Sequence, residues 1–469
     1  MRKTTLLFIP GFFIGIIFLI LTSCQPSTPA KETESYNEED ARMIKMIFDE
    51  ALENGKAYGW LEHLCVEIGP RLAGSENADK ALDWTESLMK SENFDQVFRQ
   101  EVMVPHWERG TKEKAQIVGS GEVLNVLALG GSIGTGSEGV QGEVIEVQSL
   151  DEVDELGEKV KGKIVFYNRA LDQKHVSTGA GYGGAVDQRS GGAIRAGKYG
   201  AIGVVIRSVT SAFDDAPHTG MMNYEDGVEK IPAAALGFQS ADKLAEALKK
   251  GPVELFLQMY CQWFPDAPSA NVIGQLDGSE KPEEYIVVGG HIDSWDVGQG
   301  AHDDGAGCMH SVEALRILKA IGYQPRHSLR AVMFMNEENG VRGGKKYAEI
   351  AKGKNEKHIL AIESDAGGFS PRGFGISGAD ESLDKLRSWL PLFPQNTISF
   401  INKGGGGVDV GPLYRETNTP MMGLGVDPQR MFDVHHSPND VFSTVHRREL
   451  HLGAASLAAM IYLVDKYGL

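Results

Sequence analysis

The C-terminal half of the chain alternates unbroken apolar runs with stretches of helical periodicity. The apolar runs lie at residues 285–290, 329–335 and 358–363. Runs of this length and composition are typical of parallel strands buried on both faces. Helical spacing follows at residues 306–321, from residue 343 onward and at 450–466. This alternation predicts an α/β fold with a mixed, mostly parallel central sheet and helices on both faces.

Acidic and histidine residues follow each of the three predicted strands. They are His291 and Asp293 after the first strand, Glu337 and Glu338 after the second, and Asp365 after the third. In open α/β sheets ligands bind at the carboxyl ends of the strands, so these side chains can converge. Imidazole nitrogens and carboxylate oxygens are ligands that zinc accepts in catalytic sites. The sequence therefore predicts a metal site at this edge of the sheet.

Some positions in this set have alternatives. Asp303 lies in a turn that opens the next predicted helix, where an aspartate also suits a helix N-terminus. Glu363 could replace Asp365 on spacing alone, and strand alternation favours Asp365. His435 and His436 are adjacent, and only one of them is needed as a ligand.

Five short strings around these positions resemble the co-catalytic zinc aminopeptidases, and within them the carboxypeptidase Q branch. The strings begin at His291, Asp303, Glu337, Glu363 and His436 and occur in the order of that family. The resemblance covers roughly residues 40–469. It implies a peptidase with two Zn²⁺ ions per chain. In that arrangement Asp303 bridges both ions, His291 and Asp365 complete one site, and Glu338 and His436 complete the other.

The resemblance also assigns roles to residues that do not bind the metals. Glu337 is expected to be the general base, and Asp293 is expected to hold the imidazole of His291 in the required tautomer. His436 is preferred to His435 as the ligand, because its spacing to Asp440 fits the family pattern. The peptide bond between Asp303 and Asp304 is expected to be cis, as it is in the family.

Composition changes near residue 110, which divides the chain into two expected domains. Residues 115–265 are rich in glycine and contain short β-type runs, so we expect a separate β-rich insert. Residues 191–208 and 231–233 resemble a protease-associated domain. The peptidase domain is then expected to comprise residues 41–114 and 266–469.

The N-terminus is expected to be a targeting segment. Arg2 and Lys3 precede an apolar stretch at residues 6–21, and the following residues, up to Cys24, resemble a bacterial lipobox. This implies a signal peptide at residues 1–23, a lipid on Cys24 and a location in the bacterial cell envelope, at the outer membrane or periplasmic face. The alternative is an uncleaved membrane anchor. Residues 24–40 are rich in Pro, Ser, Thr and Glu and predict a flexible tether.

The net charge and the set of candidate metal ligands restrict the possible functions. The chain has 46 basic and 64 acidic residues, a net charge of −18, and so acidic a surface disfavours nucleic acid as a partner. We therefore predict a zinc-dependent exopeptidase that hydrolyses dipeptides or the N-terminal residues of short peptides. The alternatives are a glutaminyl cyclase with a single zinc and a receptor-like binding protein. The intact ligand set argues against the binding protein. The resemblance also implies a homodimer.

Overall fold

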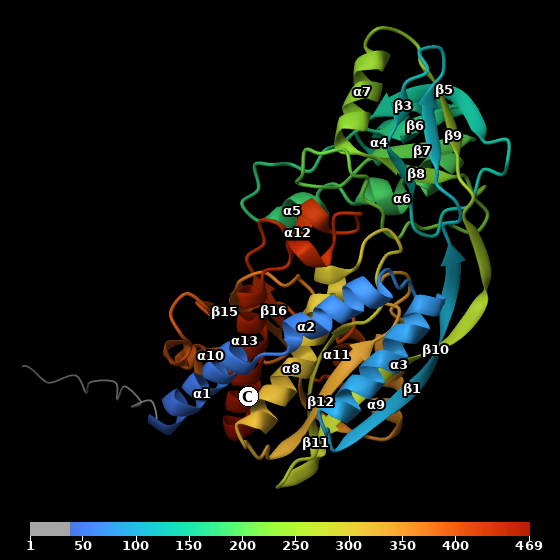
Figure 1. Ribbon diagram of the computed structural model, residues 1–469. Coiled ribbons are helices and arrows are strands. Elements are labelled where there is room, and N and C mark those ends of the chain that lie inside the picture. The colour runs from blue at the N-terminus through green and yellow to red at the C-terminus, as the bar shows by residue number, and fades with distance from the viewer. Residues whose placement is uncertain (1–37) are drawn as a thin grey trace, which may run out of the picture.

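The computed structural model describes residues 38–469, which form two sheets with their own helices (Figure 1). The predicted signal peptide, Cys24 and most of the predicted tether lie outside the described residues. The tether prediction extends too far, because helix α1 (Glu38–Asn54) already includes residues 38–40. Within the described range, none of the helices combines the length and apolar character needed to cross a membrane.

The central sheet has eight strands in the order β1-β10-β12-β11-β13-β16-β14-β15. Their bounds are β1 (Gln96–Glu108), β10 (Gln262–Leu276), β11 (Lys281–His291), β12 (His327–Phe334), β13 (Lys357–Glu363), β14 (Pro371–Ser377), β15 (Phe400–Lys403) and β16 (Met421–Val426). Strand β11 pairs in parallel with β12 and β13, and β13 pairs in parallel with β16. These central strands include the three that the apolar runs predict. The mixed, mostly parallel sheet is confirmed.

Helices cover both faces of this sheet (Figure 1). One face carries α1, α2 (Ala57–Glu62), α3 (Glu76–Ser91), α8 (Ala306–Ala320) and α13 (Arg447–Tyr467), and the other carries α9 (Arg342–Gly353) and α11 (Gly411–Thr417). Side chains of β11 alternate between the two cores: Ile286 and Val288 pack on the first face and Val287 on the second. Burial on both faces explains why the strand is a continuous apolar run. Shorter helices are α10 (Leu383–Ser388) and α12 (Met431–Val434).

The insert contains a second eight-stranded sheet in the order β3-β2-β9-β5-β6-β7-β8-β4. Its strands are β2 (Lys114–Ile117), β3 (Val123–Leu124), β4 (Val126–Ala128), β5 (Val140–Val147), β6 (Ile164–Tyr167), β7 (Gly203–Arg207), β8 (Ala233–Leu236) and β9 (Glu254–Gln258). Its helices are α4 (Leu150–Leu156), α5 (Thr178–Gly183), α6 (Asp187–Gly197) and α7 (Phe238–Leu248). Because β5 to β8 are parallel and helices connect β5 to β6 and β6 to β7, the insert is α/β rather than only β-rich.

A long antiparallel ribbon joins the two sheets. Strands β1 and β10 pair from the central sheet up toward the insert (Figure 1). The domain boundary predicted at residue 265 therefore falls inside β10, and the insert's own strands end at Gln258. The composition change marks the insert but not the strand that leads out of it.

The first described helix is fastened to the last helix by Asp40. Its carboxylate is 4% exposed and accepts hydrogen bonds from the Tyr462 hydroxyl (2.6 Å), the Lys466 ammonium (2.7 Å) and the Tyr467 hydroxyl (2.6 Å). Burial disfavours the charged form of Asp40, but the hydrogen bonds from Lys466, Tyr462 and Tyr467 outweigh it and lower its pKa. The ionised carboxylate therefore stabilises the docking of α1 on α13.

Replacing Asp40 by asparagine is expected to lower the free energy of unfolding by about 2 kcal/mol at pH 7. A depressed folded-state pKa contributes stability above the unfolded value, about 3.9, and loses it as pH falls through the folded value. The difference between wild type and Asp40→Asn should therefore shrink toward about pH 3, in urea titrations at both pH values. The matched change Asp49→Asn, in an exposed pair with Lys45, should cost less than about 0.5 kcal/mol. An equal Asp40→Asn loss at both pH values would contradict this account.

Candidate metal centre

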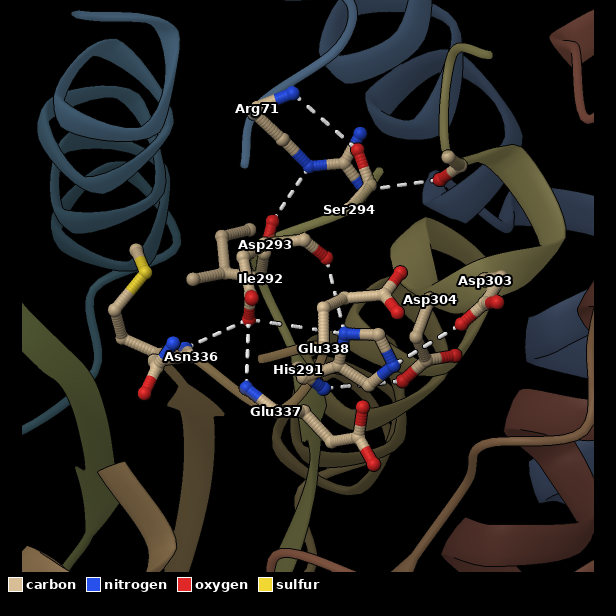
Figure 2. A network of polar contacts seen from close by, with 12 residues as sticks. Arg71, His291, Ile292, Asp293, Ser294, Asp303, Asp304, Asn336, Glu337 and Glu338 are labelled. Atoms are coloured by element: carbon tan, nitrogen blue, oxygen red, sulfur yellow. Dashed lines mark hydrogen bonds and ion pairs between the residues drawn. The ribbon is translucent and has the colours of Figure 1, made fainter. Parts of the chain in front are cut away.

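The carboxyl ends of the central strands bring predicted residues together, and Figure 2 shows His291, Asp303, Glu337 and Glu338 among them. His291 ends β11, Glu337 and Glu338 follow β12, and Asp365 follows β13. Asp303 lies in η3 (Ala301–Gly305), the turn that precedes α8, and His436 follows α12. The parallel order of β12, β11 and β13 makes these ends neighbours, as the strand-end argument requires.

Asp303 lies between two groups of side chains. Its Oδ1 is 3.2 Å from Nε2 of His291, which is also 3.5 Å from Oδ1 of Asp365. Its Oδ2 is 3.2 Å from Nε2 of His436, which is also 3.1 Å from Oε2 of Glu338. The two carboxylate oxygens of Asp303 thus face two different histidines, as a carboxylate that bridges two cations would.

The adjacent histidines differ in their contacts. His435 Nε2 lies 3.5 Å from Asp303 Oδ2, and its ring stacks on that of His436 with centroids 3.5 Å apart. Only His436 also approaches Glu338 among the ion pairs of the described chain. Both histidines can share a ligand group with Asp303. The additional contact with Glu338 favours His436.

Glu363 is occupied elsewhere. Its Oε2 accepts hydrogen bonds from the backbone N–H groups of Asp409 (2.9 Å) and Val410 (2.8 Å). Asp365, two residues further on, has its carboxylate 3.5 Å from His291 and shares a ligand group with His291 and Asp303. This geometry favours Asp365 over the spacing alternative.

Neighbouring carboxylates hold the backbone that presents Asp303. Asp304 accepts hydrogen bonds from the N–H groups of His291 (3.1 Å) and Gly307 (2.9 Å), so it caps α8 instead of facing the ligand group. Asp440 accepts hydrogen bonds from the N–H groups of His302 (2.8 Å) and Asp303 (3.1 Å). The Asp303–Asp304 peptide bond is cis. Of the two aspartates, only Asp303 therefore has the orientation of a ligand.

The loop after β11 is fastened by a fully buried arginine (Figure 2). The Arg71 guanidinium donates hydrogen bonds to the carbonyls of Ile292 (2.5 Å), Gln299 (2.7 Å) and Gly300 (2.9 Å). Because these carbonyls lie on both sides of the loop, Arg71 fixes the path of the chain from His291 to Asp303. The segment from Gly69 to Ser75, which contains Arg71, therefore has a structural role beside the site.

The role predicted for the Asp293 carboxylate needs correction. Nδ1 of His291 donates to the main-chain carbonyl of Asp293 (3.0 Å), while the Asp293 carboxylate is 3.8 Å from that nitrogen. Oδ1 of Asp293 instead accepts hydrogen bonds from the N–H groups of Asn336 (2.7 Å) and Glu337 (3.1 Å) (Figure 2). The carbonyl sets the tautomer of His291, and the carboxylate positions the backbone of Glu337.

The centre is a buried cluster of mutually close acids. His291 is 1% exposed, and Asp303 and Glu338 are each 6% exposed. Burial and the nearby Asp303 raise the pKa of Glu338 to about 7. Burial opposes protonation of His436, but Glu338 and Asp303 raise its pKa to about 10. His291 Nε2 and Asp303 Oδ2 have no hydrogen-bond partner within the described residues. Such a cluster needs positive charge, and its oxygen and nitrogen donors suit zinc.

Comparison with known proteins identifies the family. Residues 271–461 match the family described as Peptidase family M28. Carboxypeptidase Q of Bos taurus is 35% identical over 410 residues, which cover 87% of this chain and 85% of that protein. The chain belongs to peptidase family M28. Carboxypeptidase Q of Homo sapiens is 33% identical over 97% of both chains.

Solved structures agree with this membership. The M28 peptidase precursor of Shewanella amazonensis SB2B has a TM-score of 0.86 and 33% identity, and the match covers 91% of this chain and 97% of that one. A zinc aminopeptidase from Bacillus subtilis has a TM-score of 0.63 at 20% identity over 87% of this chain and 94% of that one, a likeness of fold. Family membership makes the chain a metallopeptidase, and so a hydrolase.

In this M28 peptidase the insert closes one side of the active cavity. The cavity has a volume of about 540 Å³ and is lined by Asp303, Glu337, Glu338, Asp365, His435 and His436 from the peptidase domain. Ser177, Gly179, Tyr182, Arg189 and Met221 line it from the insert. Tyr182 stacks on Phe432 of α12 with ring centroids 4.4 Å apart, which joins the two domains at the rim.

The insert also holds the segment that carries the histidines. His218 Nδ1 donates to the carbonyl of His435 (2.7 Å), and the Thr219 N–H donates to the carbonyl of His436 (2.9 Å). His436 has a φ of +60°, a conformation that side-chain-bearing residues seldom adopt without support. Burial lowers the pKa of His218 to about 4, so the ring is neutral. The insert therefore shapes the backbone of the predicted ligand.

Sequence reasoning missed these insert residues. Arg189 and Tyr182 lie in glycine-rich stretches with no motif around them, and His218 is an isolated histidine. Their roles arise from contacts with residues more than 200 positions further along the chain. A local pattern could not have identified them.

Proposed function

We propose that this M28 peptidase is a zinc-dependent exopeptidase that hydrolyses dipeptides or N-terminal residues of short peptides. The observation that carries the proposal is the position of Asp303, whose two oxygens face His291 and His436 at 3.2 Å each. One zinc would be held by His291, Asp303 and Asp365, and the other by Asp303, Glu338 and His436. The zinc aminopeptidase of Bacillus subtilis, which shares the fold, is consistent with the choice of metal.

The chain's own residues would carry the proton transfers. Zn²⁺ bound in this centre would lower the pKa of a water molecule and polarise the peptide carbonyl. Glu337 lines the cavity and has no place in either proposed ligand group. Burial raises the pKa of Glu337, and Asp365 and Glu338 add to this effect. A carboxyl with a raised pKa is suited to accept a proton from the attacking water and return it to the leaving amine near neutral pH.

Metal counting and hydrolysis together test this function. We expect purified protein to bind two zinc ions per chain, to hydrolyse a panel of dipeptides, to lose hydrolysis after treatment with a chelator and to regain it with zinc. One zinc per chain with cyclisation of N-terminal glutamine would favour a glutaminyl cyclase. Metal-free protein without hydrolysis of any dipeptide would favour a binding protein.

The insert and the N-terminus complete the proposal. We infer that the insert is a protease-associated domain, which its position over the cavity supports. We also infer from the sequence that Cys24 is lipidated and anchors the enzyme at the cell envelope. The variant Cys24→Ser should then move the protein from the membrane fraction to the soluble fraction; retention in the membrane would contradict lipidation at this residue.

A further inference from the structure

One arginine from the insert lines the cavity that contains the acids of the candidate metal centre. Arg189 lies on α6, and its side chain lines the cavity together with Asp303, Glu337, Glu338 and Asp365. Among the lining residues, all within the described chain, Arg189 is the only arginine or lysine. A guanidinium remains charged at any physiological pH. The cavity thus has one fixed positive group beside the candidate metal centre.

This guanidinium has no carboxylate partner in the described part of the chain. Its Nη1 lies 3.4 Å from Nδ1 of His436 and 3.5 Å from the carbonyl of Thr219, both at the long end of hydrogen-bond distances. Its Nε is buried without a partner. The insert's other arginines, Arg169, Arg195 and Arg207, each pair with an aspartate. Of these four arginines, Arg189 is the one without an ion pair in the described part of the chain.

The surroundings keep the guanidinium in place. It packs over the ring of Tyr182, with its central carbon 5.5 Å from the ring centroid. Gly220 has a φ of +125°, and a Cβ there would lie 2.5 Å from both Nη1 of Arg189 and Nδ1 of His436. Any side chain at residue 220 would therefore displace the two groups. Glycine preserves the space in which they meet.

The distance from the candidate metal centre suits a carboxylate one residue beyond the scissile bond. Nη1 of Arg189 contacts Nδ1 of His436, whose Nε2 on the far side of the ring contacts Asp303 and Glu338. The guanidinium is thus one imidazole ring away from these ligands. One peptide residue spans about 3.5 Å and a hydrogen bond adds about 2.9 Å. Each additional residue would carry the carboxylate about 3.5 Å further away.

We propose that Arg189 binds the C-terminal carboxylate of the substrate and thereby selects dipeptides over longer peptides. A planar guanidinium binds a carboxylate through two parallel hydrogen bonds, which fix the orientation of the carboxylate, and its positive charge compensates the negative charge. The inference rests on the proposed peptidase function and identifies the insert residue that determines specificity. Arg189 has no role in the proton transfers.

The test compares a dipeptide with its amide. Wild-type enzyme should hydrolyse Ala-Leu with a kcat/KM about 100-fold above that for Ala-Leu amide, because a charged hydrogen-bond pair is lost in the amide. In Arg189→Gln this ratio should fall to near one, mainly through a higher KM for Ala-Leu. Arg189→Lys should give an intermediate ratio, since lysine lacks the planar fork. Arg195→Gln, on the same helix, should keep the wild-type ratio.

Binding provides a second measurement that does not need turnover. A non-hydrolysable Ala-Leu analogue, with a methylene in place of the scissile carbonyl, should bind wild type about 100-fold more tightly than its amide in calorimetry. The preference should disappear in Arg189→Gln at unchanged zinc content. An Arg189→Gln variant that keeps the ratio, or a wild type that does not distinguish acid from amide, overturns the proposal. Arg189-dependent hydrolysis of Ala-Glu amide at the rate of Ala-Leu also overturns it, because Arg189 would then recognise a side-chain carboxylate.

Failure of the proposed function gives a different result. Zinc-loaded wild type that hydrolyses none of these peptides would overturn the peptidase function. Tighter binding of the analogue than of its amide would still indicate the contact between Arg189 and the carboxylate. Hydrolysis of acid and amide at equal rates would leave the peptidase function standing and remove the role of Arg189.

Discussion

Replacing Glu337 by glutamine is expected to lower kcat by about 10³-fold while the zinc content stays unchanged. Glutamine keeps the shape of the side chain but cannot take up the proton of the attacking water. The Asp293 carboxylate holds the Glu337 N–H at 3.1 Å, so the backbone should keep its position in the variant. Steady-state hydrolysis of a dipeptide, with zinc measured on the same sample, tests this expectation.

A matched change outside the cavity controls for the glutamate-to-glutamine replacement itself. Glu349 lies on α9 with its side chain 70% exposed, and Glu349→Gln should have wild-type kcat. A Glu337→Gln variant that keeps more than about one tenth of the wild-type kcat would contradict the role of Glu337 as general base, since such groups contribute 10²-fold or more. Loss of zinc from that variant would instead indicate that Glu337 is a ligand.

Replacing Asp303 by asparagine is expected to remove both metal ions and hydrolysis together. Asp303 contacts both histidines of the proposed centre, so its loss should weaken both zinc sites by more than about 100-fold. Zinc should raise the melting temperature of the wild type, because it binds only the folded protein, and should no longer do so in Asp303→Asn. Metal analysis and thermal unfolding with and without zinc measure both effects.

The metal-free variant provides the contrast. Burial disfavours ionised Asp303, but His291 and His436 hold its pKa well below its usual value, so without zinc Asp303→Asn should be less stable than the metal-free wild type. The exposed change Asp384→Asn, on α10, should leave zinc binding and the zinc-dependent rise in melting temperature intact. An Asp303→Asn protein that keeps one full equivalent of zinc would show that the two sites do not share this carboxylate.

The cavity explains how one chain combines a buried acidic centre with selectivity. The peptidase domain supplies the carboxylates and histidines at its strand ends, and the insert supplies the cationic and aromatic walls. The insert also fixes the carbonyls of His435 and His436 through His218 and Thr219. Docking of the insert is therefore coupled to the geometry of the centre.

Sequence reasoning reached the central sheet and the residues at its carboxyl edge because both are encoded locally. A strand buried on both faces must be apolar along its length, so residues 285–290 are visible as a run. Polar residues directly after such runs must lie at one edge of a parallel sheet. The family resemblance added Asp303 and His436, which do not directly follow a predicted strand.

Other details depended on atoms that a spacing pattern does not specify. His291 and Asp293 are two residues apart whether the imidazole bonds to the carbonyl or to the carboxylate, and only the folded backbone selects the carbonyl. His435 and His436 are equivalent in sequence, and the turn at His436, with its φ of +60°, decides which ring also reaches Glu338.

By itself the sequence determined the α/β core and the acidic sheet edge, since hydrophobic periodicity and strand direction are properties of short segments. Only the tertiary structure decided that an α/β insert covers the cavity and that Arg189 lies beside His436, 247 positions further along the chain. Contacts across two separate sheets depend on how their surfaces dock. Docking depends on the shape and charge of whole domain faces, and a short stretch of residues does not determine these properties.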